Sequence, residues 1–500
     1  MNCRYNLKEI FSIFRHFSLF LILLLYLPQT GCRSSETTTS RLLTKNKMVL
    51  VEGRERFLIG LYENPKDDAR LKEAIDAGFN LIQCGADKKQ LDRVHKMGAK
   101  AWINLNYNLD LSESKEKRKS KLLKIVNEFK DHPALLIWEG PDEALWNNWW
   151  GPYSYLGISE LGEMNSIVQQ NQDLQPLYNR LTDLKNRGLW AKFDTARKEF
   201  WKQAGKDMPR PNLRFAEIPD KVRQTGKGLA EGVKAVRQAD PNHIIWFNHA
   251  PRNSIADLTF YNHAIDMAGC DIYPVTAQTG HSDLPNTLVS CVGAYTDRMR
   301  RAAKKKACAM VLQGFGWWDW LPFREDKNNT PETGRRPTFT ESRFMAYDAI
   351  VHGANAIMYW GTNYVKDKNS DGKETLDTQF WRDLLAVVRE LRNLEPALAA
   401  PSAKPVPRLK LENNLGSAEE KNLPLMLKKT GDDYILIMVN ETHYGLPFTV
   451  SGLPAEMEGQ KLYRLGSSET VTVKEGRFSD GITPFDVYVY ATSRRFEPAK

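Results

Sequence analysis

The strongest constraint on the fold is a pattern that recurs along residues 56–400, where short apolar runs alternate with stretches of helical spacing. The runs are short enough for buried strands, and the stretches between them bury one stripe of apolar side chains at a period of 3.6 residues. Gly78 and Gly98 end the first two predicted helices. The predicted strands are 57–62, 81–84, 101–105, 134–138, 244–248, 267–273, 309–313 and 356–360. Eight such units in order predict an α/β fold, a closed (β/α)8 barrel.

Two segments stand outside this repeat. Residues 145–218 interrupt the unit after the fourth strand and predict a helical insertion rich in aromatic side chains, which either walls the site or packs as its own core. After a proline-rich linker at 401–410, residues 411–500 show short alternating runs with Gly-rich turns. This texture predicts a small all-β sandwich domain that binds carbohydrate or buttresses the barrel.

The first residues predict export. Basic residues precede a largely apolar run at 17–27, which is too short to span a bilayer and is typical of a signal peptide at 1–31. The sequence Thr30-Gly31-Cys32 resembles the lipobox of bacterial lipoproteins, although Gln29 departs from that pattern. The resemblance implies a lipid on Cys32, a tether at 32–55, and a location in the cell envelope, anchored to a bacterial membrane by that lipid alone. Ordinary signal cleavage is the alternative.

The net charge of +9 is spread along the chain, and no nucleic-acid-binding module is present, so we expect no nucleic acid partner.

Three carboxylates follow the fourth predicted strand. The segment 134–144 runs from a buried strand directly into a Gly-Pro turn that carries Glu139, Asp142 and Glu143. In barrels of parallel strands the reactive groups lie at the carboxyl ends of the strands. Acidic groups brought together there shift each other's pKa values, which is what acid/base cleavage of a glycosidic bond needs.

With the strands numbered, the barrel resembles the clan A glycoside hydrolases, which often carry an appended β-sandwich. Their fourth strand ends in Asn-Glu, and here Asp142-Glu143 takes that place. The segment from Pro337 to Trp360 also resembles the seventh helix and eighth strand of these enzymes. The resemblance implies that Glu143 is the proton donor, that Asp142 helps to hold the substrate, and that Trp360 lies under a sugar ring.

The resemblance fails at the seventh strand. These hydrolases end that strand with a nucleophilic Glu, whereas this chain has Gln313, and an amide cannot form a glycosyl ester. The second carboxylate is then Asp271 at the end of the sixth strand, Asp319, or Glu139; otherwise the barrel has lost hydrolysis and only binds sugar. We take Glu143 and Asp271 as the catalytic pair. Because they lie two strands apart, we expect room for water between them and therefore inversion of the anomeric centre.

Further polar and aromatic residues lie at predicted strand ends, where they can bind sugar hydroxyls or stack on a ring. The predicted substrate-binding residues are Glu139, Asp142, Asn104, Asn248, Tyr273, Gln313 and Trp360. Glu63, Asn106 and His249 are further candidates, and His249 has no second His or Cys at ligand spacing.

A separate motif, Asp367-Lys-Asn369-Ser-Asp371-Gly, matches the first half of a calcium loop but lacks the Glu at its twelfth position. A polar turn is the favoured alternative, and no cofactor is required by the predicted chemistry.

The sequence thus predicts an exported glycoside hydrolase that cleaves a poly- or oligosaccharide. The alternative is a non-catalytic sugar-binding lipoprotein on the same scaffold.

Overall fold

A closed barrel of eight parallel strands forms the centre of the structure, a computed structural model that describes residues 42–412 and 417–497. The strand order is β10-β3-β4-β5-β6-β7-β8-β9, so each strand pairs with its neighbours in the chain and β10 closes the ring on β3. The strands are β3 (Leu58–Leu61), β4 (Leu81–Cys84), β5 (Lys100–Asn104), β6 (Leu135–Glu139), β7 (Ile244–His249), β8 (Met267–Ile272), β9 (Ala307–Gln313) and β10 (Ala356–Trp360).

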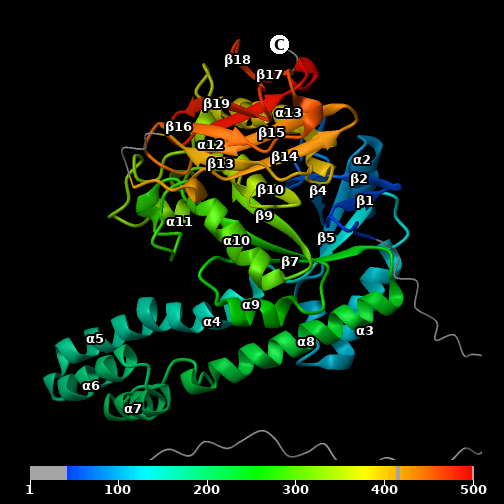
Figure 1. The fold of residues 1–500 in the computed structure, drawn as a ribbon. Coiled ribbons are helices and arrows are strands. Elements are labelled where there is room, and N and C mark those ends of the chain that lie inside the picture. Colours follow the sequence, from blue (N-terminus) through cyan, green and yellow to red (C-terminus); the bar gives the residue numbers. More distant parts are fainter. Residues whose placement is uncertain (1–41, 413–416, 498–500) are drawn as a thin grey trace, which may run out of the picture. The chain divides into compact units, whose positions relative to one another are not determined.

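Eight helices follow the eight strands in alternation and cover the outside of the barrel (Figure 1). They are α1 (Asp68–Ala77), α2 (Lys88–Lys96), α3 (Lys115–Phe129), α8 (Ile218–Ala239), α9 (Ile255–Asn262), α10 (Cys291–Ala303), α12 (Phe339–Val351) and α13 (Gln379–Ala399). Local signals set their ends. Asp67 accepts hydrogen bonds from the first turn of α1, and Gly78 ends that helix with a positive φ of 135°. The predicted (β/α)8 barrel is confirmed.

The predicted insertion after the fourth strand is an arm of four helices (Figure 1). These are α4 (Ala144–Tyr155), α5 (Leu161–Gln170), α6 (Gln175–Asn186) and α7 (Trp190–Gln203), with a π-helical turn at Leu156–Glu160. The arm has its own core, in which the buried Glu160 pairs with Arg197 at 2.6 Å and accepts a hydrogen bond from Trp201. Some aromatic residues of the arm pack inside it, and others face the mouth of the barrel.

Shorter helical turns lie in the connections. They are η1 (Asn106–Leu109), η3 (Gln172–Leu174), η4 (Phe215–Glu217), η5 (Ala277–Thr279), η6 (Trp317–Asp319), α11 (Leu321–Arg324), η7 (Glu420–Asn422), η8 (Ala455–Met457) and η9 (Arg494–Phe496).

A two-stranded hairpin precedes the barrel, formed by β1 (Val49–Val51) and β2 (Arg54–Arg56). Met48 and Val49 are buried in the barrel core. The second half of the segment expected to be a tether is thus folded, because these apolar side chains pack against the barrel. The expected signal peptide and Cys32 lie outside the described residues. Among the described helices, none combines the length and the apolar character that crossing a bilayer requires.

Two antiparallel sheets follow the barrel, as predicted for the C-terminal domain. One has the order β13-β16-β19 and the other β14-β15-β20-β17-β18. The strands are β13 (Arg408–Leu411), β14 (Leu425–Thr430), β15 (Asp433–Val439), β16 (Leu446–Ser451), β17 (Lys461–Arg464), β18 (Thr470–Thr472), β19 (Arg477–Ile482) and β20 (Val487–Ala491). The first strand begins inside the segment expected to be linker, so part of that linker belongs to a sheet.

Alternate side chains of β15 pack into two different cores, which explains how the β domain is attached to the barrel. Ile435, Ile437 and Val439 belong to the barrel's apolar core, whereas Leu436 and Met438 belong to the core between the two sheets. A strand that is buried on both faces joins the two cores. The β domain is therefore held to the barrel by apolar packing as well as by the covalent chain.

Candidate active site

A cavity of about 450 Å³ opens at the carboxyl ends of the barrel strands. This is the rim at which sequence reasoning placed the acidic loop. The residues that line it are Tyr62, Asp142, Glu143, Trp146, Trp150, Asn248, Ala250, Pro251, Arg252, Asp271, Tyr273, His281, Trp317, Trp320 and Trp360. Six of the nine residues predicted for catalysis or substrate binding are among them: Asp142, Glu143, Asn248, Asp271, Tyr273 and Trp360.

Glu143 is positioned by an unusual backbone conformation. Its φ of 48° and ψ of 33° lie in the left-handed region, at the point where the loop after β6 enters α4. The backbone N–H of Glu143 donates to the carbonyl of Asn248 at 3.2 Å, which ties this turn to the end of β7. A non-glycine residue in that region costs on the order of 1–3 kcal/mol, a strain often found at functional sites.

The carboxyls form one hydrogen-bonded network around Asn248. The Asn248 side-chain amide donates to Asp142 Oδ1 at 3.0 Å and also to Asp271 Oδ1. Asp271 in turn shares a hydrogen bond with the Glu143 carboxyl and accepts one from the Tyr273 hydroxyl. Neighbouring strands β6, β7 and β8 thus bring Glu143, Asn248 and Asp271 together, as their order in the barrel predicts.

Burial and crowding raise the pKa values of this network. Burial, together with the charge of Asp142, raises the pKa of Glu143 to about 7. Burial raises the pKa of Asp271 well above its usual range, and the charges of Glu143 and Asp142 raise it further. Two carboxyls in contact share protons because both cannot easily ionise together. The pair therefore holds a transferable proton near neutral pH.

This contact overturns the expected spacing of the pair. A hydrogen bond between the carboxyls leaves no room for a water molecule, whereas inverting pairs are about 6.5–9.5 Å apart. The wider gap on which the expectation of inversion rested is therefore absent from this structure, and the configuration of the product stays a prediction. The sequence could not reveal this contact, because Glu143 has a left-handed backbone conformation that its sequence pattern does not predict.

Glu139 and Gln313 are fully buried and do not line the cavity. Glu139 is fully buried and accepts hydrogen bonds from Tyr62 and from Trp102 Nε1, the latter at 3.0 Å. Burial raises its pKa well above the usual range. Both polar atoms of the Gln313 amide bond to the backbone. Its oxygen accepts a hydrogen bond from Val275 N at 2.8 Å, and its nitrogen donates to the carbonyls of Val275 and Phe315. Both are placed to support the rim rather than to touch a ligand.

Other candidates also have structural partners. Asn104 Oδ1 accepts from the backbone N–H of Asn106 at 2.7 Å, and Asp319 pairs with Arg336 at 2.8 Å. Burial lowers the pKa of His249 to about 4, and the ring contacts Asn262 at 2.8 Å. The partly buried Glu63 accepts a hydrogen bond from Thr362. None of these four lines the cavity within the part of the chain that the structure describes.

Two groups of aromatic rings line the cavity. Trp360 stacks on Tyr273 with ring centroids 5.6 Å apart, and the Trp317 Nε1 donates to the Tyr273 carbonyl. On the arm, Trp146 and Trp150 stack at 5.1 Å. Apolar ring faces of this kind suit the faces of sugar rings. Both alternatives for the insertion therefore hold in part. Trp146 and Trp150 line the cavity, whereas Trp190 packs on Tyr153 inside the arm.

Sequence reasoning missed Tyr62, Arg252 and His281 among the lining residues. Tyr62 directly follows β3, so the strand-end rule could have found it. Arg252 and His281 lie farther along their loops and carry no comparable signal. His281 accepts a hydrogen bond from the backbone of Tyr273 at 3.0 Å, and burial lowers its pKa to about 3.

The half-matched calcium motif folds as a hairpin between β11 (Asp367–Lys368) and β12 (Glu374–Thr375). Asn369 Oδ1 accepts from the backbone N–H groups of Asp371 and Lys373, and Asp367 pairs with Arg336 at 2.8 Å. These contacts are those of a polar turn, the favoured alternative.

The fold has counterparts among solved structures of glycoside hydrolases. A family 42 β-galactosidase from G. stearothermophilus matches with a TM-score of 0.49 and 10% identity, over 87% of this chain and 98% of that one. A family 5 glycoside hydrolase from Bacteroides vulgatus has a TM-score of 0.49 and 11% identity, over 90% and 92% of the two chains. A family 30 endoxylanase from Clostridium papyrosolvens has a TM-score of 0.41 and 10% identity, over 88% and 97%. No protein-family model and no curated protein matches the sequence. Residue roles in this chain are accordingly argued from its own geometry.

Proposed function

We propose that this protein is a glycoside hydrolase that cleaves O-glycosidic bonds of a poly- or oligosaccharide by carboxylate acid/base chemistry. The observation that carries the proposal is the Glu143–Asp271 pair, which lies in hydrogen-bond contact at the floor of an aromatic-lined cavity. Pairs of carboxyls whose pKa values are pushed apart divide the work of acid and base between them.

The roles follow from reach and environment. Glu143 is the proton donor to the leaving oxygen, since its pKa of about 7 lets it gain and lose a proton near neutral pH. Asp271 is its partner carboxylate. Asn248 and Tyr273 orient Asp271 by donating hydrogen bonds to it, and are positioning residues as well as parts of the cavity wall.

Substrate is held by rings and by polar groups at the rim. Trp360 and Tyr273 form one stacking wall, and Trp146 and Trp150 of the arm form another. A cavity of about 450 Å³ lies within the range of small-molecule sites, about 300–1,000 Å³. Longer substrates would extend along the arm.

A second candidate is a non-catalytic sugar-binding protein. Gln313 favours it, because this side chain occupies the seventh strand end and is committed to the backbone at Val275 and Phe315. In that case the acidic network would bind hydroxyls without transferring a proton.

One experiment separates the two candidates. The purified protein is incubated with a panel of oligosaccharides, and new reducing ends are measured beside binding by calorimetry. Hydrolysis that Glu143→Gln and Asp271→Asn each abolish, while binding persists, supports the enzyme. Binding without release of reducing ends from any ligand that binds supports the sugar-binding protein.

The cellular placement is part of the proposal. The Thr30-Gly31-Cys32 sequence supports export and a lipid on Cys32 in a bacterial cell envelope. Mass spectrometry of the native membrane fraction tests it. A diacylated Cys32 at the new amino terminus is expected, and an unlipidated terminus at another residue would refute it.

A further inference from the structure

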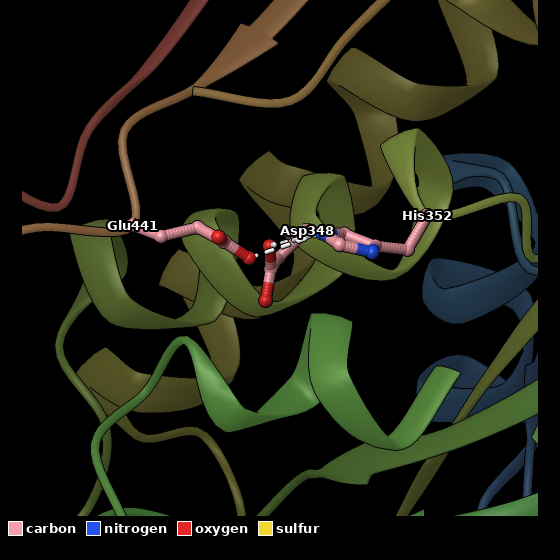
Figure 2. Close-up of side chains that lie close together, drawn as sticks. All are labelled: Asp348, His352 and Glu441. Carbon is pink, nitrogen blue, oxygen red and sulfur yellow. Dashed lines mark hydrogen bonds and ion pairs between the residues drawn. The ribbon is translucent and has the colours of Figure 1, made fainter. Parts of the chain in front are cut away.

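A cluster of a histidine and two carboxylates lies at the junction of α12 with the β domain. Asp348 and His352 are at the carboxyl end of α12, and Glu441 follows β15 (Figure 2). The end of a barrel helix leads into the amino end of the next strand, so this cluster and the catalytic cavity lie at opposite ends of the barrel. It plays no part in the chemistry proposed above.

The three side chains point toward one another (Figure 2). His352 Nε2 lies 3.0 Å from Glu441 Oε1 and 3.8 Å from Asp348 Oδ1. One ligand atom from each residue lies within 4.8 Å of the other two. In residues 42–412 and 417–497 this is the one group of three or more His, Cys, Asp or Glu side chains with that spacing.

One oxygen of the cluster lacks a donor. Asp348 is completely buried, and its Oδ2 accepts from the backbone N–H of Gly293 at 2.6 Å. Its Oδ1 faces the cluster and has no N–H or hydroxyl donor among the residues described, so the only hydrogen bond open to it is a proton shared with the Glu441 carboxyl. A buried carboxylate oxygen without a partner is costly, and a second carboxylate beside it adds repulsion. Both costs are removed by a cation between the two.

The space for such a cation is bounded by Gly293. A Cβ atom at that position would lie 2.7 Å from His352 Nε2 and 2.9 Å from Asp348 Oδ1. Because Gly293 has no side chain, the space next to His352 Nε2 and Asp348 Oδ1 stays open on this side. The ring nitrogen on the far side, Nδ1, contacts Asp297 Oδ2 at 3.0 Å. A carboxylate on the second nitrogen is the usual support of a metal-bound histidine, since it fixes the tautomer.

From this geometry we propose that Asp348, His352 and Glu441 bind one divalent transition-metal ion of the Zn²⁺ type. An imidazole nitrogen with two carboxylate oxygens is a donor set that suits Zn²⁺ better than Ca²⁺ or Mg²⁺, which prefer oxygen alone. Ligands about 2.0–2.1 Å from a tetrahedral ion are about 3.4 Å apart, and the observed 3.0 Å and 3.8 Å bracket that value. Three protein ligands leave the fourth position for water.

The ion joins the two domains. Two ligands come from the barrel and one from the β domain, so binding stabilises the docked arrangement relative to the undocked one. Two negative carboxylates and a neutral imidazole balance a charge of +2. The ion is a structural clamp and not a catalyst.

The test uses the full mature protein, stripped with a chelator and then dialysed against Zn²⁺. We expect one zinc per chain by elemental analysis and an unfolding midpoint that rises with zinc concentration. Glu441→Gln and His352→Gln should abolish stoichiometric binding, and Asp297→Asn should weaken it about 10–100-fold. Glu420→Gln, at an exposed carboxylate of the same domain, is the matched control and should bind normally.

A second measurement does not depend on any variant folding. X-ray absorption of the zinc-loaded wild-type protein should show one imidazole nitrogen and oxygen ligands around the ion. Absence of bound zinc after loading, or a ligand shell without imidazole, overturns the proposal. So does an equivalent of zinc that Asp271→Asn removes and Glu441→Gln retains, because that ion would lie in the catalytic cavity.

Discussion

Glu143 and Asp271 share a hydrogen bond, although Glu143 follows β6 and Asp271 is the penultimate residue of β8. Asn248, on the intervening strand β7, connects the two segments, because its side-chain amide donates hydrogen bonds to both Asp142 and Asp271. The pair behaves as one titrating unit, so its properties depend on how many protons the two carboxyls hold together.

The first prediction concerns the proton donor. Glu143→Gln keeps the shape of the side chain but removes the transferable proton, so turnover should fall by a factor on the order of 10² or more. Binding of an oligosaccharide should persist. Steady-state kinetics and calorimetry on the same preparation measure the two effects.

Glu163→Gln is the matched control, since Glu163 is an exposed glutamate on α5 and should leave turnover unchanged. Turnover that survives Glu143→Gln on a substrate with a poor leaving group would exclude Glu143 as the acid.

The second prediction concerns pH. Glu143 must carry its proton to act as the acid, and its pKa is about 7. We therefore expect kcat/KM to fall as pH rises through about 7. Asp142→Asn removes a charge that raises the pKa of Glu143, so it should move this limb to lower pH. An unmoved limb would contradict the assignment.

Stability provides a substrate-free check of the same group. Folding raises the pKa of Glu143 above its ordinary value of 4.5, so the native state binds this proton more tightly than the unfolded chain. That contribution is fully present below pH 4.5 and is lost as pH rises through about 7. The free energy of unfolding should decline less over this interval in Glu143→Gln than in the wild type. Equal declines in urea titrations would count against the raised pKa.

The barrel could be predicted from the sequence because its strands are buried on both faces and therefore form plain apolar runs. Strand ends then predicted Asp142, Glu143, Asn248 and Asp271 as neighbours, since carboxyl ends of parallel strands meet at one rim. The contact between Glu143 and Asp271 was not predictable, because it depends on a left-handed backbone at a non-glycine residue. The role of Gln313 was missed because its partners, at Val275 and Phe315, lie in loops without periodicity.

The third prediction separates the two aromatic walls. Trp360→Ala removes the ring stacked on Tyr273 and should weaken binding of short and long ligands by up to about tenfold, since an aromatic contact contributes about 0.5–1.5 kcal/mol. Trp150→Ala, on the arm, should weaken only longer oligosaccharides. Dissociation constants against chain length provide the readout. Equal effects of both changes at every length would show that the arm does not form a separate subsite.

The fourth prediction concerns Gln313. Restoring the carboxylate by Gln313→Glu places an acceptor against the carbonyls of Val275 and Phe315, which now receive hydrogen bonds from the amide. We expect a loss of about 1–3 kcal/mol in the free energy of unfolding and no gain in turnover. Denaturant titration measures the first effect. A variant that is both as stable and more active would show that this position can still act as a nucleophile.

The last prediction concerns the stereochemistry of cleavage. A sugar ring must enter between Glu143 and Asp271, which touch when no ligand is bound. Side-chain rotation from contact reaches the separation of about 5–5.5 Å found in retaining enzymes before it reaches the 6.5–9.5 Å of inverting ones. Asp271 would then meet the anomeric carbon directly, with no water between them, and form a covalent glycosyl ester. We therefore expect the first-formed product to keep the configuration of the substrate. Proton NMR during the first turnovers resolves the two anomers, and initial formation of the inverted anomer would show that water and not Asp271 attacks.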